Sequence, residues 1–388
     1  ASDVYKRQYP EEEPEQIVFE EESKENEILP EDMIADDSQM QTEPTEPPVM
    51  VDEQIAQALS EMKLGAEDYL SLMNGLSSVA KEVQNSVVNV VGVTSDVSWL
   101  VNEYENEGVV SGVVVADNGR ELLVLANIST ILDAESLKVI FADENEYEAS
   151  IKRMDHNTGY AVLAISKDTM KSGTLSMAKA VCLGTSGGSS LVGVSVIAIG
   201  RPMGTDGSMC YGMITSVSGN VELPDSSYKY MTTDIYGSSS ASGILINLRG
   251  QVLGMIDMTY NAPDMKNIIS AIGISDLKKV MESLSNDKDI AYFGVYGVDV
   301  TGEANEEMQV PYGAYITEID MDSPAMTAGI QSGDVIVMID ETEITNYQDL
   351  VKTLFFYEPE DEVKITFMRQ GPDGYTEMET DAVLGIKK

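Results

Sequence analysis

Short apolar runs, rich in β-branched residues and separated by glycine or polar residues, fill the chain between residues 87 and 258. Such runs are typical of β-strands. The Asn118-Gly119 and Arg249-Gly250 pairs lie between consecutive runs and are suited to tight hairpin turns. Two clusters of about six short strands, with few helices between them, predict two packed antiparallel barrels. The runs of the first cluster cover 87–93, 111–115, 122–125, 137–141, 147–151 and 160–165, and those of the second cover 191–200, 212–219, 228–234, 243–247 and 251–258.

Helical patterns flank the two predicted barrels. Leu70, Met73, Leu76 and Val79 share one helical face, which predicts a lead-in helix over residues 61–85. After the second barrel, Ser275 is expected to cap a helix that closes the unit at residue 287. The apolar stripe of that helix consists of Leu277, Val280, Met281 and Leu284. The barrel unit is therefore assigned to residues 86–287.

The pattern changes again over residues 288–388, where strands mix with two helices. Ser323 precedes Pro324 at a helix start, and Gly329 is suited to end that helix after about one turn. A second helix begins at Asn346 and runs through Phe355. Strands are expected over 333–339 and 361–369. The sequence predicts a compact α+β module in this part.

Residues 11–60 contain 17 Asp or Glu and one basic residue, Lys24, together with five prolines. Such a segment cannot bury enough apolar surface to fold, so a disordered acidic linker is expected over residues 1–60. A docking arm for a basic partner is the alternative. Over the whole chain the formal net charge is −42, which disfavours nucleic acid and anionic membrane surfaces as partners.

The chain has two cysteines and one histidine, too few for a Cys/His zinc site. Cys182 and Cys210 form either one disulfide in an oxidising compartment or two buried free thiols. The Gly/Ser loop at 185–189 lacks the GK[ST] ending of a phosphate-binding loop and is interpreted as a flexible connector. No metal or other cofactor is expected. No run approaches the roughly 18 apolar residues of a membrane span, so any membrane contact is expected through a segment outside this chain.

Several longer stretches in order resemble the HtrA (DegP-like) family, trypsin-like serine proteases that carry a C-terminal PDZ domain. The resemblance covers residues 79–388 and implies a mainly β fold, a chymotrypsin/trypsin-like double β-barrel followed by an α+β PDZ domain. It also implies an extracytoplasmic location and the possibility of a homotrimer. The stretches that carry it are VIAIGRPMG (196–204), GMITSVSG (212–219), TTD (232–234), ILINLRGQVLGM (244–255) and SPAMTAGIQSGDVIVMI (323–339).

Serine protease chemistry needs a hydroxyl nucleophile, an imidazole base and a carboxylate that orients the base. Each of the three family positions carries a different residue type in this chain. The resemblance places the histidine position on Ile128 or Ser129, in the stretch LANIST (125–130), and the carboxylate position on Gly159, in TGYAVL (158–163). It places the nucleophile position on Ala241, in SSASGIL (239–245). Ser239 stands where the family has a glycine whose N–H stabilises the oxyanion.

These substitutions predict a pseudoprotease that binds peptides without cleaving them. The alternative is an active endopeptidase with a non-standard nucleophile, in which His156, beside Asp155, would serve Ser240 or Ser242. A structural assembly unit is the third hypothesis.

The PDZ resemblance also implies a peptide-binding site. Such a domain adds the ligand as a strand and holds its terminal carboxylate with the N–H groups of a short loop. The loop corresponds to Tyr292, Phe293, Gly294 and Val295. Leu350 and Leu354 are expected to line a pocket for an apolar terminal side chain, and the alternative is that they belong to the domain core. The expected partners are peptide or protein C-termini with an apolar last residue.

Overall fold

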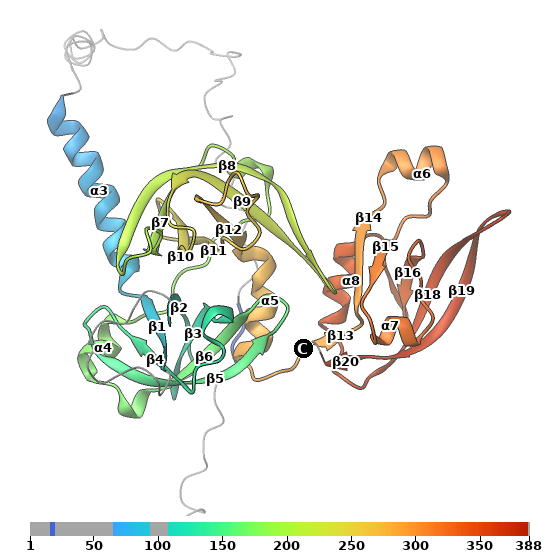
Figure 1. Ribbon diagram of the computed structural model, residues 1–388, viewed down its shortest axis with the longest axis horizontal. Coiled ribbons are helices and arrows are strands. Elements are labelled where there is room, and N and C mark those ends of the chain that lie inside the picture. Colours follow the sequence, from blue (N-terminus) through green and yellow to red (C-terminus); the bar gives the residue numbers. More distant parts are fainter. Residues whose placement is uncertain (1–15, 20–64, 94–107, 387–388) are drawn as a thin grey trace, which may run out of the picture.

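The computed structural model describes residues 16–19, 65–93 and 108–386. They form two closed six-stranded barrels followed by an α+β domain with its own sheet (Figure 1). The predicted mainly β fold, a double barrel followed by an α+β domain, is confirmed.

The first barrel has the strand order β1-β2-β3-β6-β5-β4, and every neighbouring pair is antiparallel. Its β2–β3 hairpin turns at Asn118-Gly119, as the sequence predicts. Gly119 has φ of 87°, and the Asn118 side chain accepts hydrogen bonds from the N–H groups of Arg120 and Glu121. The strands are β1 (Val87–Val93), β2 (Val109–Asp117), β3 (Glu121–Asn127), β4 (Ser136–Ile140), β5 (Glu146–Asp155) and β6 (Tyr160–Ser166).

The second barrel has the order β10-β11-β12-β9-β8-β7. Its strands are β7 (Ser195–Arg201), β8 (Ser208–Leu223), β9 (Ser226–Tyr236), β10 (Ser242–Asn247), β11 (Val252–Ile256) and β12 (Ile268–Gly273). β8 and β9 are long, with 16 and 11 residues, and their hairpin extends beyond the barrel until its tip meets the C-terminal domain (Figure 1).

Helix α5 (Ile274–Ser285) packs against β5 and β6 of the first barrel and against β9, β11 and β12 of the second. The predicted apolar stripe is correct, because its four residues are all buried. The prediction that Ser275 caps the helix is wrong, since the helix begins at Ile274 after Gly273. Ser275 instead exchanges two 2.8 Å hydrogen bonds with Ser186, each backbone N–H donating to the other's hydroxyl. These bonds fix the 185–189 loop, interpreted above as a flexible connector, at Ser186.

Helix α3 (Ala66–Gln84) leads into the first barrel, and residues 61–64 of the predicted helix lie outside the described residues. Most of the predicted acidic linker, residues 1–60, lies outside them as well. Its described part, residues 16–19, contacts the folded barrels rather than solvent alone. Ile17 pairs with the Asn286 side chain through its N–H (2.7 Å) and its carbonyl (2.6 Å), while Ile17 and Phe19 pack on the core. None of the helices in the described ranges is long and apolar enough to cross a membrane.

The C-terminal domain is built on a sheet of order β14-β15-β16-β18-β19, with β17 beside β16. The predicted cap of its short helix α7 is confirmed, because the Ser323 hydroxyl accepts from the N–H of Met326 at 3.1 Å. The strands are β13 (Ala291–Tyr292), β14 (Val295–Asp299), β15 (Ala314–Ile319), β16 (Val335–Ile339), β17 (Thr342–Glu343), β18 (Glu362–Gly371), β19 (Gly374–Val383) and β20 (Gly385–Ile386). The helices are α6 (Gly302–Met308), α7 (Pro324–Thr327) and α8 (Tyr347–Leu354).

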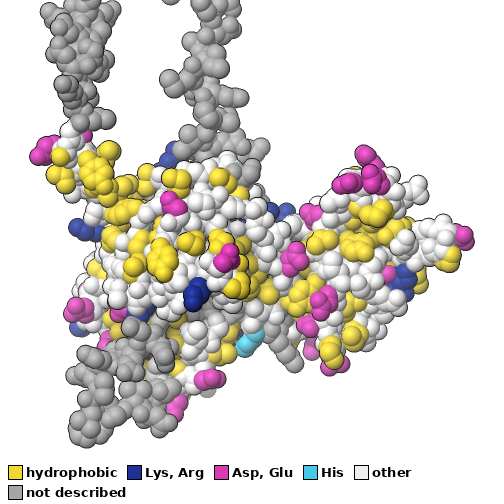
Figure 2. All heavy atoms as spheres, turned by 45° about the horizontal axis from the view of Figure 1, so that its top comes forward, with side chains coloured by type: hydrophobic (Ala, Val, Ile, Leu, Met, Phe, Trp, Pro, Cys, Tyr) yellow, Lys and Arg dark blue, Asp and Glu magenta, His cyan; other side chains and the backbone are white. Residues whose placement is uncertain are grey.

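Acidic side chains form no single patch on the face of the molecule shown in Figure 2. On the face shown in Figure 2 they are spread over both the barrels and the C-terminal domain, among exposed hydrophobic side chains. On this face the negative charge is therefore distributed over both parts of the molecule and is not concentrated at one site.

Candidate active-site cleft and peptide-binding loop

A cleft with a volume of about 480 Å³ lies between the two barrels. The first barrel contributes the start of β2, the end of β3 and the 3-10 turn η4 (Ser129–Ile131). The second contributes the turn before β10 and the end of β11. The structure thus brings three of the predicted positions, Ser129, Ser239 and Ala241, to one cleft. Its lining residues are Val109, Val110, Asn127, Ser129, Thr130, Ser239, Ser240, Ala241, Ser242, Ile256, Asp257, Met258 and Thr259.

Of the two residues proposed for the histidine position, only Ser129 faces this cleft. The Ile128 side chain is fully buried in the core of the first barrel. Gly159 lies directly behind Ser129, because a methyl group added at Gly159 would lie 2.7 Å from the Ser129 hydroxyl oxygen. The geometry therefore pairs position 159 with position 129.

A chain of hydrogen bonds joins Ser129 to a buried carboxylate. The Ser129 hydroxyl contacts Oδ1 of Asn127, and Nδ2 of Asn127 donates to Oδ2 of Asp257 at 3.2 Å. Asp257 is only 4% exposed and also accepts from the N–H of Thr259 at 2.9 Å. Because an asparagine amide does not take up a proton at neutral pH, this chain orients the serine without activating it.

Sequence reasoning missed Asp257. It is one of 66 acidic residues and belongs to no motif that sets it apart from the others. Only the closure of the second barrel brings the end of β11 to the cleft.

The turn before β10 carries Ala241, whose side chain is 7% exposed. Its backbone N–H donates to the carbonyl of Ser238 at 3.1 Å, so this donor is engaged inside the turn. The Ser240 hydroxyl shares a hydrogen bond with that of Ser238 (2.9 Å), and the Ser242 hydroxyl accepts from the N–H of Ser111 (3.0 Å). These partners of the two hydroxyls are neutral groups that cannot act as a general base.

His156 lies on the surface, in the turn that follows β5, and does not line the cleft. Its neighbour Asp155 is 1% exposed and accepts hydrogen bonds from the Thr158 hydroxyl (2.8 Å) and the Asn157 N–H (3.3 Å). The structure therefore does not bring His156 together with Ser240 or Ser242.

Beneath the cleft, the first residue of β6 places a tyrosine hydroxyl in the core. Tyr160 is fully buried, and its hydroxyl has no hydrogen-bond partner among the residues that the structure describes. Burial raises the pKa of this phenol well above its usual value, and the nearby charge of Asp257 raises it further. Tyr160 is therefore neutral at physiological pH and cannot act as a general base.

In the C-terminal domain, the predicted peptide loop lies between β13 and β14 and already holds a carboxylate. The N–H groups of Phe293 and Gly294 donate to Oδ2 of Asp225 at 2.7 and 2.8 Å, and that of Val295 donates to Oδ1 at 3.0 Å. Gly294 has φ of 87°, and a methyl group there would lie 2.3 Å from Cβ of Ser323. A glycine is thus required for the three donors to converge. Asp225 belongs to the β8–β9 hairpin and was not singled out by sequence reasoning.

Both predicted pocket leucines belong to the core of this domain, with Leu350 fully buried and Leu354 2% exposed. The side of α8 that faces β14 is occupied by Tyr347. Its hydroxyl donates to the carbonyl of Val295 at 2.9 Å, and its ring lies so close that a methyl group on Gly297 would be 2.6 Å away.

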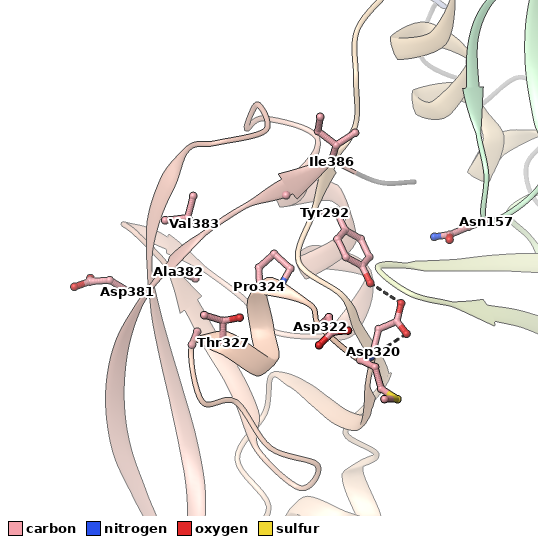
Figure 3. Close-up of a pocket in the computed structure, with 13 residues that line it drawn as sticks. Asn157, Tyr292, Asp320, Asp322, Pro324, Thr327, Asp381, Ala382, Val383 and Ile386 are labelled. Atoms are coloured by element: carbon pink, nitrogen blue, oxygen red, sulfur yellow. Dashed lines mark hydrogen bonds between the residues drawn. The ribbon is translucent and has the colours of Figure 1, made fainter.

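A separate cavity of about 670 Å³ lies on the other side of the loop, bounded by α7, β20 and the barrel turn at Asn157 (Figure 3). Tyr292 points into it and donates to Oδ2 of Asp320 at 2.5 Å. Burial, followed by the hydrogen bond to the Asp320 carboxylate, raises the pKa of Tyr292. The side chain of Tyr292 therefore lines this cavity, whereas the backbone N–H groups of the loop bind the carboxylate of Asp225.

The two cysteines are free thiols in the structure, Cys182 exposed and Cys210 half-buried. Burial raises the pKa of the Cys210 thiol. Over the described ranges, no group of three or more His, Cys, Asp or Glu side chains is arranged to hold a metal ion.

Both parts of the chain are similar to known proteins. The family model of the trypsin-like peptidase domain matches residues 110–255, and that of the PDZ domain matches residues 292–380. The serine protease Do-like HtrA of Lactococcus lactis subsp. cremoris is 26% identical over 335 residues, which cover 76% of this chain and 80% of that protein. A probable periplasmic serine endoprotease, DegP-like, of Halomonas elongata is 27% identical over 274 residues, covering 69% of this chain and 55% of the relative.

Solved structures show the same fold. The HtrA-type protease AlgW with a decapeptide superposes with a TM-score of 0.56 at 22% identity, covering 80% of this chain and 98% of that one. A serine endoprotease from Yersinia pestis gives a TM-score of 0.53 at 22% identity, with 80% and 97% covered.

Proposed function

We propose that this HtrA/DegP-like chain, which joins a trypsin-like peptidase domain to a PDZ domain, is a pseudoprotease that binds peptide or protein C-termini without cleaving them. The PDZ domain supplies the binding function. The barrels serve as its scaffold.

The residues at the three triad positions carry this proposal. Ser129, Gly159 and Ala241 offer neither a proton acceptor nor a nucleophile at the position where the family attacks its substrate. In a serine protease, loss of the triad costs roughly 10⁶ in turnover, and the oxyanion hole alone retains about 10³ to 10⁴ over water. The Ala241 N–H donates to the carbonyl of Ser238, so this donor is not free to stabilise an oxyanion. This bond supports the loss of the residual oxyanion-hole catalysis as well.

The proposed setting is extracytoplasmic. The support is the name of the Halomonas relative, which describes a periplasmic protein, together with the resemblance to the HtrA family. We also propose that the chain assembles as a homotrimer. Any attachment to a membrane would be made by a segment outside this chain. The strong negative charge supports a partner other than nucleic acid.

An active endopeptidase is the second candidate, because the relatives in the comparisons are named as proteases. In this chain it would need Ser240 or Ser242 as a nucleophile. The neutral hydrogen-bond partners of both hydroxyls argue against that role.

Labelling with a fluorophosphonate probe, combined with a casein hydrolysis assay, separates the two candidates. We expect no adduct and no cleavage above buffer, with trypsin as the positive control. Cleavage that disappears in S240A or S242A, together with an adduct on the same serine, would establish the endopeptidase.

A further inference from the structure

The carboxylate-binding loop of the PDZ domain is occupied from within the chain. The oxygens of Asp225 accept three backbone hydrogen bonds of 2.7 to 3.0 Å from Phe293, Gly294 and Val295. Charge-assisted bonds of this kind are about twice as strong as neutral ones. A terminal carboxylate of a peptide would need the same three donors.

Asp225 also reproduces the backbone contact of a peptide ligand. Its N–H donates to the carbonyl of Val295 at 2.8 Å. Val295 begins β14, which is the edge strand of the sheet and hence the strand to which a ligand would add. One residue therefore supplies both the carboxylate and the first strand-like contact.

The shape of the hairpin fits this role. Pro224 and Asp225 form the two-residue turn between β8 and β9, and Asp225 has φ of 54°, a conformation that aspartate tolerates better than most residues. The hairpin brings this turn to the domain from the second barrel (Figure 1). Gln348 of α8 holds the start of β9, two residues after Asp225, since its Nε2 donates to the carbonyl of Ser227 at 3.1 Å.

There is no room for a second carboxylate beside the first. Asp225 is 4% exposed, and Tyr347 covers the adjoining stretch of β14 through its bond to Val295 and its contact with Gly297. A peptide reaches the loop only after the hairpin tip has left.

We propose that Asp225 is an internal ligand of the PDZ domain, which keeps the peptide site closed until a peptide with a free C-terminal carboxylate displaces the β8–β9 hairpin. This inference rests on the proposed peptide-binding function only for the identity of the displacing ligand. The internal contact itself is testable without any peptide.

Hydrogen–deuterium exchange of the full chain is the first test. D225N keeps the size of the side chain but removes its charge, and D225G removes the side chain while suiting the positive φ of the turn. E222Q is the matched control, because it neutralises an exposed carboxylate on the same hairpin. We expect the amides of residues 293–295 to exchange roughly ten to a hundred times faster in both Asp225 variants, and at the wild-type rate in E222Q.

Peptide binding is the second test. The probes are fluorescein-labelled decapeptides with a Gly/Ser spacer and a last residue of Val, Leu or Phe, each made as a free acid and as a C-terminal amide. If the closed state holds all but a few per cent of the molecules, D225N and D225G will bind the free acids on the order of tenfold more tightly than wild type. The amides should gain nothing.

Equal exchange rates at residues 293–295 in wild type, D225N and D225G would overturn the internal ligand, whatever the peptides do. Faster exchange in the two variants, with no peptide bound by any form, would support the internal ligand and count against the proposed peptide-binding function. Faster exchange with unchanged affinity for a peptide that does bind would overturn the claim that Asp225 closes the site.

Discussion

The cleft between the barrels and the loop of the PDZ domain differ in what each site is made of. A serine protease cleft depends on side-chain chemistry, and the residues that we propose for the three triad positions are Ser129, Gly159 and Ala241. The PDZ loop depends on backbone N–H groups, and all three of its donors converge on one carboxylate. Single substitutions remove a side chain without touching the fold, whereas backbone donors remain for as long as the loop keeps its conformation.

The two sites nevertheless share one requirement, which is glycine at a position with positive φ. Gly243, two residues after the nucleophile position, has φ of 129°, and Gly294 of the PDZ loop has φ of 87°. In both sites the conformation of the turn therefore depends on a glycine, whatever side chains stand beside it.

The largest effect is expected from G243A. A methyl group at this position would lie 2.0 Å from the carbonyl oxygen of Ile199 in the neighbouring strand β7, where backbone cannot give way. We expect a loss of roughly 4 kcal/mol or more in the free energy of unfolding, measured by urea titration with far-UV circular dichroism.

G187A is the matched control, because Gly187 is exposed and a methyl group there would contact nothing within 4 Å. It should change the free energy of unfolding by no more than about 0.5 kcal/mol. If G243A were as stable as wild type, Gly243 would not pack closely against Ile199 in the folded protein. The conformation of the cleft turn would then not depend on a glycine, as that of the PDZ loop does.

The fold was predictable from the sequence to the level of domains, because strand runs and turn pairs such as Asn118-Gly119 are local signals. The resemblance predicted a site at Ser129 and Ala241, and the structure brings both residues to one cleft. The sequence left Ile128 and Ser129 as alternatives, because only the closed barrel shows that Ile128 is buried and Ser129 exposed. Asp225 was out of reach of local reasoning. Its partners are about 70 residues away in the chain, and nothing in a Pro-Asp turn indicates which surface it meets.

An intermediate effect is expected at Gly159, where the family's carboxylate would stand. G159A places a methyl group 2.7 Å from both the Ser129 hydroxyl and Oδ1 of Asn127, on a residue with φ of 77°. We expect a loss of about 1 to 3 kcal/mol in the free energy of unfolding. The same urea titration measures it.

G119A separates the steric cost of the added methyl group from the conformational cost of a positive φ. Gly119 has a similar φ of 87°, but a methyl group there meets nothing within 4 Å, so only the conformational cost of roughly 1 kcal/mol applies. A larger loss in G159A than in G119A would show that the cleft has repacked around glycine. Equal losses would mean that Ser129 and Asn127 move aside freely, and the position would then be open to a carboxylate.

The smallest effect is expected from A241S, which places a hydroxyl at the proposed nucleophile position. Exchanging one methyl hydrogen for a hydroxyl beside the cleft should alter the free energy of unfolding by less than about 1 kcal/mol. Hydrolysis should stay at the buffer rate, because no imidazole faces position 241 and the N–H of that residue is bonded to Ser238. The measurement is casein cleavage by A241S, beside S242A as a variant of the first residue of β10. Cleavage by A241S alone would show that the cleft still holds a working base. The proposal that the cleft has lost its side-chain chemistry, while the PDZ loop keeps its backbone donors, would then be wrong.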